Sequence, residues 1–182
     1  MAKIAVMLAD GFEEIEGLTV VDICRRCGID VVTVSIKNDK NIMGSHNIPV
    51  IADEIMENIN FDLIDMIVLP GGKAGTDNLE ACEPLLKKID EFVRDDKYVA
   101  AICAAPRILG HRGLLNGRVA CSYPTFESHL EGAIVSHNPA EQSDKIITGR
   151  GMGTSIDFAL KIAEQFVEKD KVEDVAVGIV YR

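Results

Sequence analysis

The sequence predicts one α/β domain over residues 1–182, in which helices cover both faces of a mostly parallel, doubly wound central sheet. Three observations predict this fold class. A chain of 182 residues can bury one continuous core but is short for two domains. Its strand-like segments are continuous apolar runs, which is typical of strands buried on both faces. These runs alternate with segments of helical spacing, and that alternation indicates a parallel sheet.

The first half of the chain alternates apolar runs with turn residues. The expected elements are a strand at 3–9, a helix at 13–28, a strand at 30–36, a hairpin or arm at 42–51 and a strand at 64–69. The acidic residues that begin at Glu13 are typical of a helix start, and the β-branched residues of 30–36 favour a strand. Pro70-Gly71-Gly72 ends the last of these strands.

The second half repeats the pattern. Apolar residues from Cys82 to Val93 recur at intervals of three and four, which predicts an amphipathic helix at 81–94. A strand is expected at 98–102, and strand-like segments recur at 118–122 and 145–148. The last strong helix carries one apolar stripe, formed by Ile156, Ala159, Leu160, Ala163 and Phe166.

The composition excludes several classes of partner. The net charge is −10, whereas a phosphate backbone requires clustered Lys and Arg, and the densest basic runs are only Arg25-Arg26 and Lys87-Lys88. The longest apolar stretches have strand length, and the N-terminus lacks a signal-peptide layout. We therefore expect a cytoplasmic protein with neither nucleic-acid nor membrane partners.

The cysteines are odd in number and lack the spacing of a disulfide framework. They are Cys24, Cys27, Cys82, Cys103 and Cys121. Cys24 and Cys27 form a C-x-x-C at the end of a helical pattern, where redox chemistry of the thioredoxin type is not expected, so helix packing is the favoured interpretation. The histidines show no paired spacing that would complete a zinc site, and no metal is expected.

In doubly wound sheets, ligands bind beyond the carboxyl ends of the strands. The segments that follow the predicted strands there are 10–16, 71–75, 103–106 and 149–154. All are turns rich in Gly, Ala or acidic residues. The 149–154 turn lacks the third glycine of a dinucleotide loop and a phosphate-loop lysine. Arg150 in this turn either binds an anionic substrate group or only fixes the turn.

Cys103 lies between a buried strand and a new helix, with small residues on both sides. This arrangement predicts a nucleophile elbow, in which the side chain is lifted clear of the sheet. The helix N-terminus would favour the thiolate, and the amides of Ala104 and Gly72 would form an oxyanion hole. The alternative is that Cys103 is simply a small buried apolar residue.

Three acidic side chains lie in the first turn of the first predicted helix. Glu13, Glu14 and Glu16 are favoured at a helix start by the helix dipole alone. Their loop opens at the same sheet edge as the Cys103 elbow, so one of these carboxyl groups can face the cysteine. If burial keeps that group protonated, it can donate a hydrogen bond to the thiolate and transfer a proton.

Motifs from the whole length match one known family in order and spacing. They are LADGFEEIE near the N-terminus, VLPGG at 68–72, AICAAP at 101–106 and TGRGMGTS at 148–155. The sequence thereby resembles the ThiJ/PfpI superfamily, whose domain is of the class I glutamine amidotransferase type. Within it, the chain resembles the branch of the parkinsonism-associated deglycase and the bacterial ThiJ/YajL-like proteins. The resemblance implies a flavodoxin-like sandwich, usually a homodimer.

The same resemblance implies site residues. It places an oxidation-sensitive nucleophile at Cys103, its acidic partner at Glu16, and oxyanion-hole amides at Gly72 and Ala104. Ala104 stands where the protease-like branches have a histidine, so peptidase activity is not expected. Tyr123 replaces a histidine of the human-type branch, which leaves most of the proton transfer to Glu16. Further candidate substrate contacts are Gly71, Tyr123 and Arg150.

The implied activity is cofactor-free, stress-related chemistry on small reactive carbonyls. It is either a glutathione-independent glyoxalase that converts methylglyoxal into lactate, or a deglycase that removes early adducts from glycated proteins. Cys103 would add to the carbonyl carbon and Glu16 would move the proton. The alternative is a non-catalytic redox sensor or chaperone, in which Cys103 is oxidised to a sulfinate held by Glu16. A homodimer is also indicated by the first helix, whose apolar residues exceed one stripe.

Overall fold

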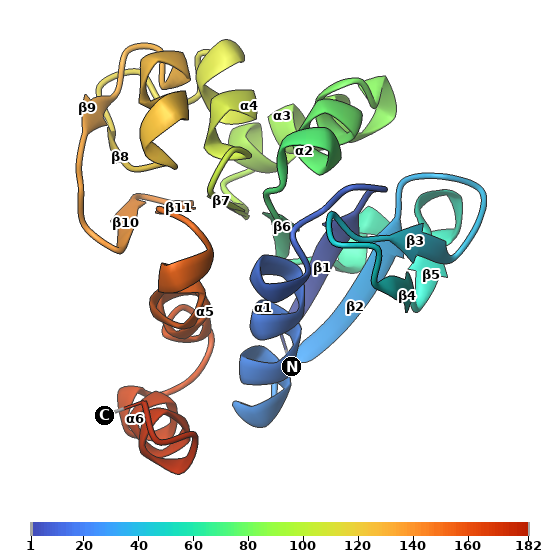
Figure 1. Cartoon of the computed structure of the whole chain (residues 1–182). Coiled ribbons are helices and arrows are strands. Elements are labelled where there is room, and N and C mark those ends of the chain that lie inside the picture. The colour runs from blue at the N-terminus through green and yellow to red at the C-terminus, as the bar shows by residue number, and fades with distance from the viewer. Residues whose placement is uncertain (1, 182) are drawn as a thin grey trace.

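The structure is a computed structural model that describes residues 2–181, and it has helices on both faces of a seven-stranded sheet (Figure 1). The strand order is β10-β11-β7-β6-β1-β2-β5. The strands are β1 (Lys3–Leu8), β2 (Asp30–Ser35), β5 (Glu54–Ile55), β6 (Met66–Leu69), β7 (Tyr98–Ile102), β10 (Ala140–Ser143) and β11 (Ile146–Gly149).

Every pairing in this sheet is parallel except that of β10 with β11. The central strands β1, β6 and β7 are almost entirely buried, which explains why they read as uninterrupted apolar runs. Counted in chain order, the five main parallel strands have the order 2-1-3-4-5 of a flavodoxin-like sheet. The predicted fold class is confirmed.

The helices form two layers, each with its own core. Helices α1 (Glu14–Arg26), α5 (Ser155–Ala163) and α6 (Lys169–Gly178) pack on one face. Helices α2 (Lys73–Glu80), α3 (Glu83–Arg94) and α4 (Pro106–His111) cover the other (Figure 1). Alternate residues of β1 divide between the two cores, as expected of a strand that is buried on both faces.

Smaller elements surround the sheet. The predicted arm is the antiparallel hairpin of β3 (Asn41–Met43) and β4 (Pro49–Ile51). The segment predicted at 118–122 contributes only β8 (Val119–Ala120), which pairs with β9 (Ile134–Val135) outside the main sheet. The 3₁₀ turns are η1 (Met56–Asn58), η2 (Phe61–Leu63), η3 (Pro124–His129) and η4 (Met152–Thr154).

The first helix uses most of its apolar surface in the core. Cys24 and Cys27 are buried there without a disulfide, so helix packing is the role that the structure gives them. Ile15 and Leu18 remain exposed, at 50% and 38%. The apolar surface available to a partner is therefore narrower than the sequence pattern indicates. Within residues 2–181, no helix has both the length and the apolar character needed to cross a bilayer.

Candidate active site

The predicted site residues meet at the carboxyl ends of β1, β6 and β7. These strands are neighbours in the sheet, so the loops that follow them lie together (Figure 1). The loop after β1 leads to Glu16, the turn after β6 contains Gly72, and Cys103 directly follows β7. The order of the strands reverses between β1 and β6, which is the point where this fold class binds its ligands.

Cys103 has the backbone of a nucleophile elbow. Its φ is +64°, a left-handed conformation that non-glycine residues rarely adopt. The strained turn is held from both sides: the Cys103 amide donates to the carbonyl of Gly149 at 2.9 Å, and its carbonyl accepts from the amide of Tyr123 at 2.9 Å. The sharp turn predicted from the small neighbours is confirmed. The thiol is half-buried rather than enclosed in the core.

Glu16 lies beside this cysteine and is 1% exposed. Its Oε2 accepts a hydrogen bond from the amide of Gly71 at 2.9 Å, while its Oε1 is buried without a hydrogen-bond partner. A Cβ at Gly71 would come within 2.4 Å of Glu16 Oε2 and 2.6 Å of Cys103 Cβ. Only glycine fits between the two side chains, so Gly71 is what allows them to meet.

Two backbone amides act on the Cys103 sulfur. Those of Gly72 and Ala104 hydrogen-bond to it and oppose the rise of its pKa. Gly72 reaches this position with φ at +84°, and a Cβ there would lie 2.4 Å from the carbonyl oxygen of Gly11. Both amides therefore reach the Cys103 sulfur, and their role as oxyanion-hole donors stays a prediction.

Glu16 and Cys103 affect each other's ionisation unequally: the hydrogen bond with Cys103 lowers the pKa of Glu16, whereas the charge of Glu16 raises the pKa of Cys103. Burial raises the pKa of Glu16 to about 7, despite hydrogen bonds with Cys103 and Gly71 that lower it. Burial, followed by the charge of Glu16, raises the pKa of Cys103 to about 12. Between these two pKa values, the pair holds one proton and one negative charge. The expectation that the helix N-terminus lowers the pKa of the Cys103 thiol is wrong, because burial and the charge of Glu16 outweigh the two amides.

Glu14, the neighbouring buried acid, points to the hairpin instead. Its Oε1 accepts from the His46 amide at 2.8 Å, and its Oε2 contacts the Ser45 hydroxyl at 3.1 Å. Glu13, Glu14 and His46 are also the one group of three potential metal ligands found within residues 2–181, with ligand atoms within 4.8 Å of one another. Sequence reasoning missed this contact, because nothing in the 42–51 pattern indicates which helix the arm touches.

The remaining predicted contacts lie around the rim. Tyr123 is 47% exposed, and its ring lies 3.5 Å from the position of a Cβ at Gly151. Arg150 Nη1 donates to the carbonyl of His137 at 2.7 Å, and Nη2 lies 3.7 Å from Oε1 of Glu127. The guanidinium thus fixes its own turn. Substrate contact by Tyr123 and Arg150 stays a prediction.

Sequence reasoning also missed Arg107, a charged side chain nine-tenths buried in the first turn of α4. The signal was present in two places. A lone arginine directly after AICAAP interrupts an otherwise apolar helix, and Asp77 and Glu80 have the i, i+3 spacing that places two carboxylates on one helix face.

Comparison with known proteins agrees with this geometry. The chain matches the model of the DJ-1/PfpI family over residues 2–165. Protein DJ-1 homolog B of Arabidopsis thaliana is 35% identical over 182 residues, which is 99% of this chain but 42% of that relative. The chain therefore spans less than half the length of that relative.

Two further proteins match over most of their length. The glutathione-independent glyoxalase DJR-1.2 of Caenorhabditis elegans is 30% identical over 166 residues, covering 90% of this chain and 87% of the relative. A crystallised variant of a DJ-1 superfamily protein from Salmonella typhimurium superposes with a TM-score of 0.95 at 32% identity, with 100% of both chains covered. The present chain belongs to the DJ-1/PfpI family.

Proposed function

We propose that the protein acts on small reactive carbonyls through Cys103, as a glutathione-independent glyoxalase or a deglycase. One observation carries the proposal: a buried carboxyl group with one unpartnered oxygen adjoins a cysteine in a strained elbow, and two amides hydrogen-bond to its sulfur. The glyoxalase name of the Caenorhabditis elegans relative supports the substrate class.

The first step uses the shared proton. When the Cys103 thiol gives this proton to the Glu16 carboxylate, the resulting thiolate accepts hydrogen bonds from the carboxyl group and from the amides of Gly72 and Ala104. The thiolate sulfur attacks the aldehyde carbon of methylglyoxal, a C–S bond forms, and the carbonyl π electrons move to oxygen. The amides of Gly72 and Ala104 stabilise that oxyanion. Glu16 then protonates it, which gives a hemithioacetal and a Glu16 carboxylate.

The second step moves hydrogen between adjacent carbons. The Glu16 carboxylate removes the proton from the former aldehyde carbon, and the resulting enediol is reprotonated at the neighbouring carbon. The first carbon is oxidised to a thioester and the second is reduced to an alcohol, so no external oxidant or reductant is consumed. Water cleaves the thioester, releases lactate and regenerates Cys103. A deglycase would begin with the same addition, on an early adduct of a glycated protein.

Turnover of methylglyoxal without glutathione tests the proposal. Cys103→Ser is expected to abolish lactate formation, because the hydroxyl is a far weaker nucleophile at neutral pH. Cys82→Ser is the matched control, since Cys82 is also half-buried but lies outside the site. It should retain wild-type turnover. Equal turnover by wild type and Cys103→Ser would remove Cys103 from the reaction.

The non-catalytic alternative uses the same pair. A sulfinate formed at Cys103 by peroxide would accept a hydrogen bond from protonated Glu16, whose buried Oε1 has no other partner. Mass spectrometry after limiting peroxide should then find Cys103 oxidised before the other four cysteines. Peroxide sensitivity combined with an absence of Cys103-dependent turnover would favour this sensor or chaperone role over catalysis.

The homodimer and the cytoplasmic location belong to the same proposal. Support for a dimer comes from a groove of about 730 Å³ along α1, where Ile15, Leu18 and Ile48 are exposed. A second copy of the chain would cover these side chains. Light scattering at micromolar concentration should give the mass of a dimer, and a monomer mass would refute this part of the proposal.

A further inference from the structure

A cluster of charged side chains lies behind the Cys103 elbow, and the proposed chemistry does not use it. Its centre is Arg107, whose side chain is 10% exposed, so that its positive charge requires partners. Two carboxylates of α2 provide them: Nε donates to Oε2 of Glu80 at 3.0 Å, and Nη2 donates to Asp77. Because Asp77 and Glu80 share one face of α2, a single guanidinium binds both.

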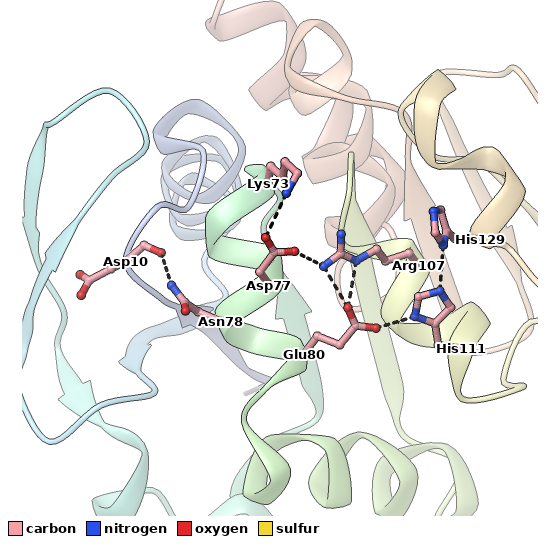
Figure 2. Close-up of polar contacts among 8 residues, drawn as sticks. All are labelled: Asp10, Lys73, Asp77, Asn78, Glu80, Arg107, His111 and His129. Carbon is pink, nitrogen blue, oxygen red and sulfur yellow. Dashed lines mark hydrogen bonds and ion pairs between the residues drawn. The ribbon is translucent and has the colours of Figure 1, made fainter.

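The cluster extends from α2 and α4 to η3. Glu80 Oε1 lies 2.6 Å from Nδ1 of His111, and Nε2 of His111 lies 2.9 Å from Nδ1 of His129 in η3. The guanidinium of Arg107 also lies 5.4 Å from the ring centre of Phe126 in η3. Figure 2 shows the continuous path from Asp77 through Arg107, Glu80 and His111 to His129. Arg107 therefore joins three elements at once.

On its other side, helix α2 is hydrogen-bonded to the loop after β1. The side-chain amide of Asn78 donates to the carbonyl of Asp10 at 2.8 Å, as Figure 2 shows. The backbone amide of Gly75 donates to the carbonyl of Gly11 at 3.0 Å. That loop leads directly to Glu16. Helix α2 is thus held between the segment that carries the acid and the helix that follows Cys103.

This arrangement matters because α2 has only eight residues and Gly72 is the residue that caps its N-terminus. A shift of the helix at Asp77 or Glu80 moves the Gly72 amide at its N-terminus. We propose that Arg107 is a positioning residue: by binding Asp77 and Glu80 it fixes α2 against α4 and holds the Gly72 amide on the Cys103 sulfur. The inference rests on the proposed cysteine chemistry, in which that sulfur carries negative charge.

The same helix offers a matched control. Arg112, at the C-terminal end of α4, donates from Nε to Oδ1 of Asp90 at 2.7 Å and from Nη2 to Oδ2 of the same carboxylate. This bridge joins α4 to α3 and does not involve α2. Arg112→Met therefore removes an arginine–carboxylate bridge from α4 while the contact between Arg107 and α2 remains.

The experiment measures alkylation of Cys103 by iodoacetamide as a function of pH, in wild type, Arg107→Met, Arg107→Lys and Arg112→Met. Circular dichroism and melting temperature monitor the fold. Arg107→Met should slow alkylation about tenfold at neutral pH and raise the apparent midpoint by about one pH unit, as expected when one hydrogen bond to a charged atom weakens. The alkylation rate of Arg107→Lys should lie between those of wild type and Arg107→Met, since lysine keeps the positive charge but lacks the forked guanidinium that binds two carboxylates. Arg112→Met should keep the wild-type pH profile.

The proposal is overturned if folded Arg107→Met has the wild-type profile, or if Arg107→Met and Arg112→Met shift it equally. If Arg107→Met does not fold, the test uses Arg107→Lys and Glu80→Gln instead. A wild-type pH profile of alkylation in both variants overturns the proposal. Methylglyoxal turnover is measured on the same samples. An inactive wild type would refute the proposed function, while the alkylation comparison would still test the positioning role.

Discussion

Glu14 and Glu16 lie two residues apart in the first turn of α1, and both are buried, at 4% and 1% exposure. The pKa values of their carboxyl groups nevertheless depart in opposite directions from that of an ordinary glutamate. Burial alone would raise the pKa of Glu14, but hydrogen bonds from His46, the Glu14 amide and Ser45 outweigh it and lower the pKa to about 2. Burial raises the pKa of Glu16 to about 7.

The difference teaches that donors, rather than depth, decide which buried acid is available for chemistry. Glu14 is already paired through both oxygens, so its charge is permanent and serves the fold. Glu16 accepts a hydrogen bond from the Gly71 amide and hydrogen-bonds with the Cys103 side chain, and its Oε1 is left without a partner. Its proton is therefore exchangeable near neutral pH, and the nearest group that can share it is Cys103.

The largest expected effect separates the two acids by catalysis. Glu16→Gln should lower methylglyoxal turnover by about 10²- to 10⁴-fold, the usual contribution of a general acid–base group. Glu14→Gln, corrected for the folded fraction, should stay near wild type, because Glu14 faces the hairpin. The measurement is lactate formation without glutathione. Equal losses in the two variants would show that the difference in protonation has no catalytic meaning.

The second effect is on stability, with opposite signs for the two acids. A carboxyl with a lowered pKa contributes stability above about pH 4.5 and loses it as the pH falls toward about 2, as for Glu14. A raised pKa, as for Glu16, gives stability that is complete below about pH 4.5 and lost as the pH rises through about 7.

At mildly alkaline pH, Glu14→Gln should therefore destabilise the fold by about 2 kcal/mol, since charge-assisted hydrogen bonds are lost. Glu16→Gln should stabilise it by up to about 3 kcal/mol, because the buried charge is removed. Urea denaturation at acidic and alkaline pH measures both, and the gain from Glu16→Gln should disappear in acid. Destabilisation by both variants at alkaline pH would contradict the assigned protonation of Glu16.

The third effect is a change of about tenfold in the alkylation rate of Cys103, and it tests the hydrogen-bond donor that Glu16 presents to the sulfur. Glu16→Gln keeps an N–H donor and removes the opposing charge, so Cys103 should stay reactive at neutral pH. Glu16→Leu removes charge and donor together and should alkylate about tenfold more slowly than Glu16→Gln, the value of one charged hydrogen bond. Iodoacetamide rates measured by mass spectrometry decide, and identical rates would leave Glu16 without a role as donor.

The strands and the elbow were predictable because their signals are local. Uninterrupted apolar runs identified β1, β6 and β7, and β-branched residues identified β2. Small residues around Cys103 predicted the turn that its φ of +64° confirms. Parallel topology then brought the loops of Glu16, Gly72 and Cys103 to one sheet edge. The fold class and the place of the candidate site follow from these patterns alone.

The electrostatics of the site was not predictable in the same way. The helix N-terminus suggested a lowered thiol pKa, but that pKa depends on burial and on the distance to a carboxylate from another segment. The contacts Glu14–His46 and Arg107–Glu80 likewise join residues 32 and 27 positions apart. Such pairs have no periodicity of their own, so only the packed structure shows them.

The smallest effect tests the hydrogen bond between the exposed ring of His46 and the buried carboxylate of Glu14. His46 Nδ1 lies 3.1 Å from Oε2 of Glu14, and this hydrogen bond, with the charges of Glu13 and Glu14, raises the pKa of His46. A raised histidine pKa gives stability that is complete below about pH 6.5 and lost as the pH rises through the folded-state value. Relative to wild type, His46→Gln should therefore have a slightly lower melting temperature at mildly acidic pH, where the His46 ring is protonated, and an unchanged one at alkaline pH. Salt should reduce the difference, because the His46 ring is exposed to solvent. His137→Gln is the control, since His137 has similar exposure but contacts one carboxylate, Glu127. If the two variants show the same pH dependence, the His46 ring adds nothing specific to Glu14, and the amide of His46 with Ser45 accounts for its low pKa.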